Sequence, residues 1–397
     1  MKVAVMGYGT IGSGVVEILE MNKEVIAKRS GEPVEMKYIL DIREFPGTPI
    51  EKLVVHDYKT IAEDPEVGIV VETMGGVEPA FTFVKAMLEA GKHVTTSNKN
   101  LVAAKGGELL EIARQHNVNF EFEASVGGGI PIIRPLQKCL TADVIEEISG
   151  ILNGTTNYML TRMTNEGADF DAVLKDAQAK GYAERNPEAD IEGYDPSRKI
   201  AILTSLIAGQ QIDFEDIPCE GITKITPVEI AYAKAMGRTI KLLASSRRVG
   251  DSFCCMVAPF MLDAAHPLAV VNGVFNAIFV HGNALGDGMF YGSGAGKLPT
   301  ASAVVSDVID MTKHQNTNIY VEWKQEKLTL VDPKDSCNAF FVRTTSSKEA
   351  IEAAFGPVSY IEGIAEGELG FTTQVMAESE FAAKSAQIAV INRIRLG

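Results

Sequence analysis

The fold of this chain is decided by its first stretch, Lys2-Val3-Ala4-Val5-Met6-Gly7-Tyr8-Gly9-Thr10-Ile11-Gly12. Its apolar half suits a buried strand, its second half is a glycine loop of the form G-x-G-x-x-G, and the helix-like segment 13–21 follows at once. In this order Gly7 permits a tight turn, Gly9 lets the backbone approach a pyrophosphate, and Gly12 lets the helix pack on the strand. The N-terminus of that helix supplies unpaired N–H groups for phosphates. The sequence therefore predicts a dinucleotide site at Gly7, Gly9, Thr10, Ile11 and Gly12, against the alternative of a turn that needs glycines for packing alone.

Outward from this loop, short apolar runs alternate with amphipathic stretches as far as residue 137. This alternation is typical of a parallel sheet with helices on both faces, so residues 1–137 are expected to form a Rossmann-type doubly wound domain. Residues 138–312 mix strands and long helices and are expected to form a second, α+β domain. Residues 313–397 show a β-α-β-β-α order that ends in a helical segment over 378–395, which predicts a small α+β module.

Composition limits the class of partner. The chain has 37 Lys and Arg against 52 Asp and Glu, a formal charge of -15, which argues against binding to nucleic acid or to anionic membranes. No apolar run approaches the ~18 residues of a membrane-spanning helix, and the N-terminus lacks the apolar length of a signal peptide. The five cysteines are widely spread without a C-x-x-C pair, so we expect reduced core residues in a cytoplasmic protein. They are Cys139, Cys219, Cys254, Cys255 and Cys337.

The choice between NAD and NADP stays open in the sequence. An acidic residue about 20 residues beyond the glycines usually binds the adenine ribose. Asp41 ends the strand-like segment 36–42 but lies 29 residues after Gly12, so a first helix that extends to about Lys28 is expected to absorb the difference. Arg43 follows two positions later and suits a 2′-phosphate instead. A role in a turn after the strand is the alternative for both side chains.

Two further segments of the first domain carry candidate site residues. The strand-like Val94-Thr95-Thr96 runs into a polar loop, which makes Thr96 and Ser97 candidate cofactor contacts and Lys99 a candidate site cation, unless Lys99 is a solvated surface lysine. Segment 123–131 follows a strand and contains three glycines. Its carbonyls, together with the Glu123 carboxylate, suit a hard cation such as sodium, and a plain hinge is the equal alternative.

The second domain contains the densest group of charges. Segment 181–199 holds five acids and three bases in nineteen residues, and the polar loop 150–157 precedes a helix expected over 158–163. Asp195 and Pro196 are predicted to be the N-cap and first residue of an apolar helix, which places Lys199 in its first turn. There the helix dipole and burial lower the pKa of a lysine while Asp195 raises it, a balance that suits proton transfer. A solvated acidic loop is the alternative.

Seven motifs taken together resemble homoserine dehydrogenase, and the likeness covers residues 1–312 in order. They are GYGTIG (7–12), VVETMGG (70–76), GKHVTTSNKNLVA (91–103), EASVGGGIPII (123–133), GILNGTTNYML (150–160), GYAERNPEADIEGYDPSRKIAIL (181–203) and GSGAGKLPTASAVVSD (292–307). The resemblance implies an NAD(P)-dependent oxidoreductase that interconverts L-aspartate 4-semialdehyde and L-homoserine in threonine, methionine and isoleucine biosynthesis.

The resemblance also implies roles for individual residues. Lys199, beside Asp195, is then the proton donor to the substrate carbonyl, and Lys99 is a second lysine near nicotinamide and substrate. Substrate contacts fall on Glu184, Asp190, Gly154, Thr155 and Tyr182, a late cofactor contact on Gly296, and a sodium site on Glu123 and the carbonyls of Val126, Gly128 and Ile130.

The same likeness implies an assembly and a regulator. The family forms dimers through a sheet of its second domain, so we expect a catalytic and dimerisation domain over 138–312 in a homodimer or higher homo-oligomer. Longer members end in an ACT regulatory module, and 313–397 is an ACT-like version without the D-x-P-G turn of the effector site, so a threonine effector is a hypothesis. Leu40 stands where many members carry an arginine, so strict NADP preference is not expected.

Two other functions compete with this one. Aspartate-semialdehyde dehydrogenase handles the same aldehyde but needs a cysteine nucleophile, and none of the five cysteines lies in a polar strand-to-helix turn. A cofactor-binding regulatory protein without catalysis predicts a broken proton-transfer site, yet Lys99, Glu184, Asp190 and Lys199 are all in place.

Overall fold

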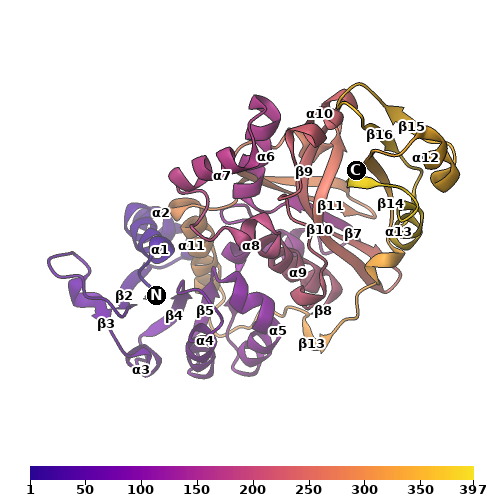
Figure 1. Ribbon diagram of the computed structural model, residues 1–397. Coiled ribbons are helices and arrows are strands. Elements are labelled where there is room, and N and C mark those ends of the chain that lie inside the picture. Colours follow the sequence, from indigo (N-terminus) through magenta and orange to yellow (C-terminus); the bar gives the residue numbers. More distant parts are fainter. The chain divides into compact units, whose positions relative to one another are not determined.

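The computed structural model describes residues 1–397, and its first sheet consists of six parallel strands in the order β3-β2-β1-β4-β5-β6 (Figure 1). The strands are β1 (Lys2–Met6), β2 (Glu35–Leu40), β3 (Val54–Val55), β4 (Val67–Glu72), β5 (His93–Thr96) and β6 (Phe120–Glu121). The order reverses between β1 and β4, which is the switch point of a doubly wound sheet, where ligands bind at the carboxyl ends of the strands. The predicted Rossmann-type sheet is confirmed.

Helices cover both faces of this sheet, with α1, α2 and α11 on one side and α3, α4 and α5 on the other (Figure 1). They are α1 (Thr10–Met21), α2 (Lys23–Ser30), α3 (Tyr58–Ala62), α4 (Ala80–Glu89), α5 (Lys99–Gln115) and α11 (Lys297–Lys313). One apolar cluster joins Val3 and Val5 of β1 to Val15 of α1 and Val304 of α11. The single first helix expected to reach Lys28 is instead two helices, because the chain breaks at Asn22 and α2 ends at a left-handed Gly31.

A second, mainly antiparallel sheet has the order β12-β11-β7-β9-β10-β18-β14-β16-β15, with β17 paired to β14. Its first part is made of β7 (Ile145–Ile151), β9 (Arg238–Val249), β10 (Ser252–Asp263), β11 (Phe275–Gly282) and β12 (Gly286–Ser293). The helices of this region are α6 (Gly154–Glu166), α7 (Phe170–Ala179), α8 (Glu188–Ile191), α9 (Tyr194–Ala208) and α10 (Pro227–Ala235). β9 and β10 form a long hairpin whose register runs from Arg238 opposite Asp263 to Val249 opposite Ser252.

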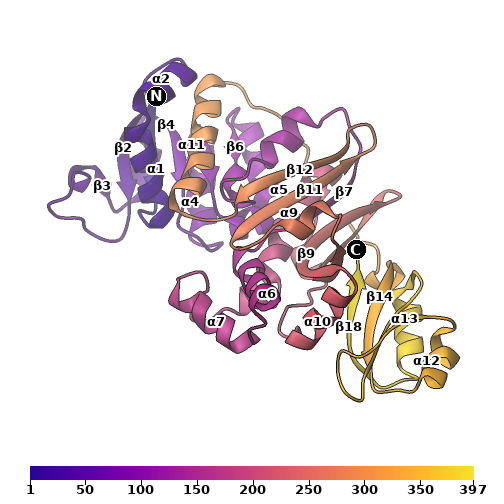
Figure 2. The same cartoon turned by 90° about the horizontal axis from the view of Figure 1, so that it is seen from above.

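Apart from the two-residue strand β17, the C-terminal module has β-α-β-β-α-β order and strand order β18-β14-β16-β15, with α12 and α13 packed together over it (Figure 2). Its elements are β14 (Cys337–Thr344), α12 (Lys348–Phe355), β15 (Ser359–Ile361), β16 (Leu369–Thr372), β17 (Met376–Ala377), α13 (Glu378–Ser385) and β18 (Val390–Leu396). The expected helix over 378–395 is wrong in its second half. That half is the strand β18, because it pairs parallel with β10 on one side and antiparallel with β14 on the other.

By its contacts the chain divides into two units. Unit 1 is Met1–Asp143, Ala201–Phe214 and Gly292–Leu328, and it includes a small pair of strands, β8 (Gln210–Gln211) and β13 (Lys324–Lys327). Unit 2 is Val144–Ile200, Glu215–Tyr291 and Thr329–Gly397. The three consecutive blocks expected from the sequence therefore differ from the observed division, because the chain returns twice to unit 1.

The cysteines lie in different surroundings. All five cysteines are free thiols, but Cys139 and Cys337 are exposed rather than in the core. Cys139 is the last residue of the short helix Pro135–Cys139 and Cys337 is the first residue of β14, so both lie at the ends of elements. Cys219 and Cys254 are half-buried, and Cys255 is buried. None of the helices has the length and apolar character needed to span a membrane.

Candidate functional site

The glycine loop between β1 and α1 has the geometry that its three glycines predict. Gly7 has φ of +95°, a left-handed conformation that favours glycine. A Cβ on Gly12 would lie 1.9 Å from the carbonyl oxygen of Gly7, so no side chain fits there. A Cβ on Gly9 would meet nothing within 4 Å. The space over Gly9 is therefore open, as the close approach of a pyrophosphate requires.

The late glycine-rich turn lies beside this loop within unit 1. Gly296 has φ of +120° and precedes the first residue of α11. A Cβ on Gly14 of α1 would lie 2.9 Å from the carbonyl oxygen of Lys297, so the two helices are in close contact at that point. This turn therefore joins the strand β12 to α11, and α11 begins against the second turn of α1.

Asp41 and Arg43 form one hydrogen-bonded pair at the end of β2. The Asp41 carboxylate accepts from the backbone N–H of Tyr8 at 2.8 Å, from the backbone N–H of Arg43 at 3.0 Å, and from the Arg43 Nε and Nη2 at 2.9 Å each. The hydrogen bonds from Arg43 hold the pKa of Asp41 below its usual range. The Asp41 side chain is 7% exposed and that of Arg43 is 56% exposed, so the arginine is the accessible member of the pair.

A buried carboxylate, Glu72, organises the neighbouring strand ends. It accepts from the Thr96 hydroxyl at 2.5 Å and from the backbone N–H of Met74 at 2.6 Å, and its burial raises its pKa. Thr96 in turn accepts from the backbone N–H of Asn98, whose side chain caps α5, the helix that begins with Lys99. Glu72 therefore holds the segment that carries Thr96, Ser97 and Lys99. Sequence reasoning gave it no role, although an acid that ends an apolar strand is a usable indication.

The candidate sodium segment presents carbonyl oxygens rather than a carboxylate. The Glu123 side chain accepts three backbone hydrogen bonds, from Ile132 at 2.6 Å, Ile133 at 2.8 Å and Arg134 at 2.7 Å, so its oxygens are already occupied. The buried carbonyl oxygens of the segment's candidate ligands Val126, Gly128 and Ile130 accept no hydrogen bond. No cluster of three His, Cys, Asp or Glu side chains suits a metal anywhere in the chain. Buried oxygens of this kind suit a hard cation.

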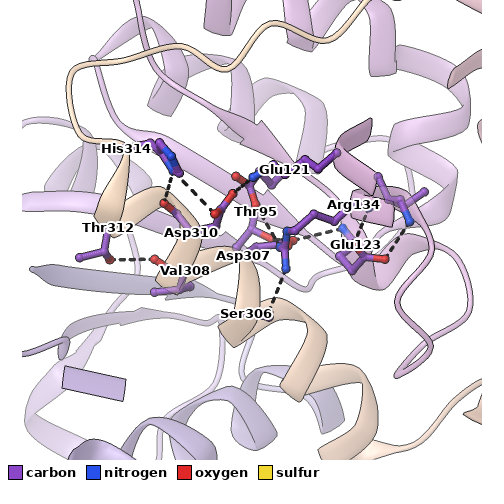
Figure 3. A network of polar contacts seen from close by, with 12 residues as sticks. Thr95, Glu121, Glu123, Arg134, Ser306, Asp307, Val308, Asp310, Thr312 and His314 are labelled. Carbon is purple, nitrogen blue, oxygen red and sulfur yellow. Dashed lines mark hydrogen bonds and ion pairs between the residues drawn. The ribbon is translucent and has the colours of Figure 1, made fainter. Parts of the chain in front are cut away.

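Behind this segment lies a buried ion cluster around Asp307 of α11 (Figure 3). Asp307 accepts from the Thr95 hydroxyl at 2.8 Å and from the backbone N–H of Glu123 at 3.1 Å, and it pairs with the Arg134 guanidinium. The side chain of Asp307 is 1% exposed. The cluster ties α11 to β5 and to the candidate sodium segment.

Replacing Asp307 with asparagine is expected to destabilise the protein by about 3 kcal/mol, because it removes the buried carboxylate that pairs with the half-buried Arg134 and holds Thr95 and Glu123. Urea unfolding of the Asp307→Asn variant measures this loss. Glu111→Gln, in the exposed pair with Arg114, is the matched control and is expected to cost less than about 1 kcal/mol. Equal effects of the two substitutions would contradict the structural role of the cluster.

In unit 2, Lys199 lies in a buried polar arrangement at the start of α9. Its Nζ donates to the Asp195 carboxylate and to the Leu152 carbonyl, each at 2.7 Å, and the Lys199 side chain is 11% exposed. The Asn153 side-chain amide donates to Asp195 at 3.0 Å and to Asp190 at 2.7 Å. These hydrogen bonds connect the side chains of Asp190, Asn153, Asp195 and Lys199 into one polar group. The helix begins at Tyr194, so Lys199 lies in its second turn, whereas the sequence predicted the first turn.

Asn153, which contacts Asp190 and Asp195, is also the N-cap of α6. Its side chain accepts from the backbone N–H of Thr156 at 2.9 Å. The helix begins at Gly154, four residues before the expected start, because Asn153 provides this cap. The Thr155 hydroxyl donates to the Tyr182 carbonyl at 2.6 Å. The two predicted substrate segments, 150–157 and 181–199, are therefore joined.

The structure does not bring Glu184 into this arrangement. Glu184 is exposed, and its carboxylate makes no hydrogen bond or ion pair within unit 2. Only its carbonyl is bonded, to the Gln178 side chain at 3.1 Å. Tyr182 is also exposed, and its ring contacts Tyr158 edge-on.

A second buried lysine, Lys241 of β9, contacts α6 through the side chain of Asn157. Its Nζ donates to the Asn157 side chain at 3.2 Å, to the Val271 carbonyl at 2.5 Å and to the Asn272 side chain at 3.0 Å. Burial lowers its pKa to about 8. Sequence reasoning missed this residue, because an alternating strand gives no indication that one of its lysines points into the core.

Comparison with known proteins identifies the family. The family model "Homoserine dehydrogenase, NAD binding domain" matches residues 7–123, and the model "Homoserine dehydrogenase" matches residues 131–309. Homoserine dehydrogenase of Synechocystis sp. is 40% identical over 98% of this chain and 92% of that protein. The chain belongs to the homoserine dehydrogenase family. A solved homoserine dehydrogenase from Thiobacillus denitrificans has a TM-score of 0.91 with 34% identity and covers 100% of this chain and 98% of that one.

As a homoserine dehydrogenase family member, the chain is an NAD(P)-dependent oxidoreductase. A hyperthermophilic archaeal homoserine dehydrogenase in complex with NADPH has a TM-score of 0.67 and 26% identity, covering 78% of this chain and 97% of that one. The predicted family and the predicted class of cofactor are confirmed. The open space over Gly9 and the N-terminus of α1 fit the phosphates of such a cofactor.

Proposed function

We propose that this chain interconverts L-homoserine and L-aspartate 4-semialdehyde, and that Lys199 moves the proton on the substrate oxygen. The observation that carries the proposal is the burial of the Lys199 ammonium between the Asp195 carboxylate and the Leu152 carbonyl. Both acceptors orient the Nζ, and a charged donor in a site that excludes water stabilises negative charge on a carbonyl oxygen. A structural lysine would not need a pair of acids joined through Asn153.

The chemistry divides between cofactor and protein. A nicotinamide cofactor, when bound, would supply reversible hydride transfer at the hydroxyl-bearing carbon. The neutral amine of Lys199 takes the hydroxyl proton as homoserine is oxidised, and the ammonium of Lys199 gives a proton to the aldehyde oxygen in the other direction. Lys99 is proposed as the second lysine near nicotinamide and substrate. We place the cofactor on unit 1, with contacts from Gly7, Gly9, Thr10, Ile11, Gly12, Thr96, Ser97 and Gly296.

Binding of the amino-acid part uses the remaining groups of unit 2. We propose that Asp190 and Glu184 attract the substrate ammonium, and that Gly154, Thr155 and Tyr182 line the site. Asp190 is already oriented by Asn153, whereas the exposed Glu184 would have to move to a bound substrate. The first turn of α6 offers N–H groups that suit the substrate carboxylate.

Steady-state oxidation of L-homoserine by the purified protein tests this function. Homoserine-dependent formation of reduced cofactor, with NAD or with NADP, is the expected result. If folded protein turned over neither cofactor, the proposed reaction would be wrong and a regulatory, non-catalytic role would gain support. Its place is proposed to be the biosynthesis of threonine, methionine and isoleucine in the cytoplasm.

We infer that both cofactors are accepted and that Arg43 favours NADP. Asp41 is neutralised by Arg43, so it does not repel a 2′-phosphate, and the exposed guanidinium can turn toward one. In the Arg43→Ala variant the freed Asp41 carboxylate can accept from the ribose hydroxyls of NAD. We expect the ratio of kcat/KM for NAD to kcat/KM for NADP to rise about tenfold to a hundredfold, since a charged hydrogen bond contributes about 1.5–3 kcal/mol.

A matched control separates this effect from loss of surface charge. Arg114→Ala removes an arginine of α5 that pairs with Glu111, away from β2, and is expected to leave the ratio unchanged. An Arg43→Ala variant with the wild-type ratio would contradict the inference.

Three further proposals concern ions, assembly and regulation. A sodium ion at the Val126, Gly128 and Ile130 carbonyls, close to Glu123, is supported by the lack of hydrogen bonds to those buried oxygens. A homodimer or higher homo-oligomer is supported by a concave face of the second sheet that includes Leu243, Met256 and Phe279. The ACT-like topology of the C-terminal module supports threonine as a candidate effector.

A further inference from the structure

A short segment of unit 2, Pro218–Ile222, runs between the C-terminal module and the turn that precedes α9; we call it the strap. The strap follows β10 through two backbone hydrogen bonds with Val257, one from the Val257 N–H to the Pro218 carbonyl at 2.9 Å and one from the Glu220 N–H to the Val257 carbonyl at 2.7 Å. Cys219 lies opposite Val257 in this bridge. The strap therefore has a defined position on the sheet.

The other edge of the strap touches the turn 191–193, which joins α8 to α9. The backbone N–H of Ile222 donates to the Ile191 carbonyl at 2.8 Å. A Cβ on Gly221 would lie 2.1 Å from that carbonyl oxygen, so the two backbones are packed with no space for a side chain. The turn comes directly after Asp190 and directly before α9, which carries Asp195 in its first turn and Lys199 in its second. A shift of the strap therefore shifts the elements that hold these three side chains.

Two arginines from the last strand, β18, hold the strap from the module side. Arg393 donates to both Glu220 oxygens at 2.9 Å each, and Arg395 donates to Glu220 at 2.8 Å. Although burial raises the pKa of Glu220, the hydrogen bonds from Arg395 and Arg393 lower it to about 2, so the pairing is ionic at any working pH. Glu378, the first residue of α13, accepts from the Arg395 Nε at 2.5 Å. Glu378 of α13 is thus connected to the strap through the charged side chains of Arg395, Arg393 and Glu220.

We propose that Arg393, Arg395 and Glu220 are positioning residues for the reaction, which couple the C-terminal module to the amino-acid site through the strap. The proposal rests on the proposed function of Asp190 and Lys199. A ligand that displaces β18 or α13 would move Arg393 or Arg395 and, through them, Glu220. The module can therefore influence the reaction through these contacts. The route ends at the amino-acid site of unit 2, so it changes the KM for homoserine and not the affinity for the cofactor.

The module contains a second ion cluster that supplies a matched control. Arg343 pairs with Glu229 of α10 at 2.7 Å and with Glu368, and this cluster makes no contact with the strap. Glu220→Gln removes one carboxylate from Arg393 and Arg395, which both keep Glu378, and Glu368→Gln removes one carboxylate from Arg343, which keeps Glu229. A difference between them therefore reports on the strap and not on the loss of an ion pair as such.

The test measures KM for homoserine, kcat, cofactor affinity and local amide hydrogen exchange in both variants. We expect Glu220→Gln to raise the KM for homoserine about threefold to thirtyfold, with an unchanged dissociation constant for the cofactor. Peptides that cover 188–195 are expected to exchange faster in this variant, even without substrate. Glu368→Gln is expected to change none of these quantities. Gly221→Ala, which displaces the turn from the strap side, is expected to reproduce the effect of Glu220→Gln.

The outcomes separate this proposal from the proposed function. Wild-type exchange and wild-type KM in the Glu220→Gln variant would overturn the coupling, and so would equal changes in both variants. A wild-type protein without homoserine turnover would refute the proposed reaction, while faster exchange of 188–195 in Glu220→Gln alone would still support the mechanical link.

Discussion

Replacing Lys199 with alanine is expected to lower kcat for L-homoserine oxidation by about a thousandfold, with little change in the affinity for the cofactor. The ammonium lies within hydrogen-bond distance of the Asp195 carboxylate and the Leu152 carbonyl, so it is held in one position. Its loss removes both the group that moves the proton and the charge that stabilises the developing oxyanion, and positioned proton transfer contributes about 10²–10⁴-fold to a rate. Steady-state kinetics with cofactor binding measured separately tests this expectation.

Two control variants distinguish the loss of the Lys199 amino group from a general effect of substitution on the fold. Lys175→Ala removes an exposed lysine of α7 in the same unit and is expected to retain wild-type kcat. Lys199→Arg keeps a positive charge but does not release its proton near neutral pH, so its kcat is expected to stay low. A folded Lys199→Ala enzyme that keeps more than about a tenth of wild-type kcat would contradict the catalytic role.

The second large effect concerns the glycine loop. Gly9→Ala is expected to weaken cofactor binding about tenfold to a hundredfold while leaving the free energy of unfolding unchanged. An added Cβ at Gly9 meets nothing in the protein within 4 Å, and Gly9 has extended backbone angles that alanine adopts, so the folded protein tolerates it. The same methyl group would crowd a bound pyrophosphate, and overpacking costs about 1–3 kcal/mol.

Gly12→Ala provides the contrast to this variant. Its Cβ would lie 1.9 Å from the Gly7 carbonyl oxygen, so the loop itself must distort, and we expect both cofactor affinity and stability to fall. Isothermal titration with the cofactor and thermal unfolding of the two variants distinguish the two cases. A Gly9→Ala protein that binds the cofactor like the wild type would show that no phosphate group approaches this loop.

Local patterns account for what the sequence predicted well. The glycine loop, the strand before it and the helix after it are adjacent in the chain, so their residue types alone indicate the turn. Asp195 and Lys199 are four residues apart on one helix, which places them on the same face. The start of that helix was wrong by two residues, because the turn at Gly193 lets Tyr194 already adopt helical geometry.

Long-range pairing accounts for most of what the sequence did not reveal. The strand β18 had the alternation of a strand but also the composition of a helix, and only its neighbours β10 and β14 decide between the two. Glu220 and Arg395 are 175 residues apart, so no spacing rule connects them. The bonds from Asn153 to Asp190 and Asp195 likewise depend on the fold that brings 153 and 190 together.

Hydride transfer from homoserine is tested most directly with L-homoserine in which both hydrogens of the hydroxyl-bearing carbon are replaced by deuterium. Incubation with the wild-type protein and oxidised cofactor is followed by NMR of the nicotinamide ring. The account predicts one deuterium on each molecule of reduced cofactor, and almost none formed by Lys199→Ala in the same time. Reduced cofactor without deuterium, or no reduced cofactor at all from folded wild-type protein, would contradict hydride transfer from homoserine.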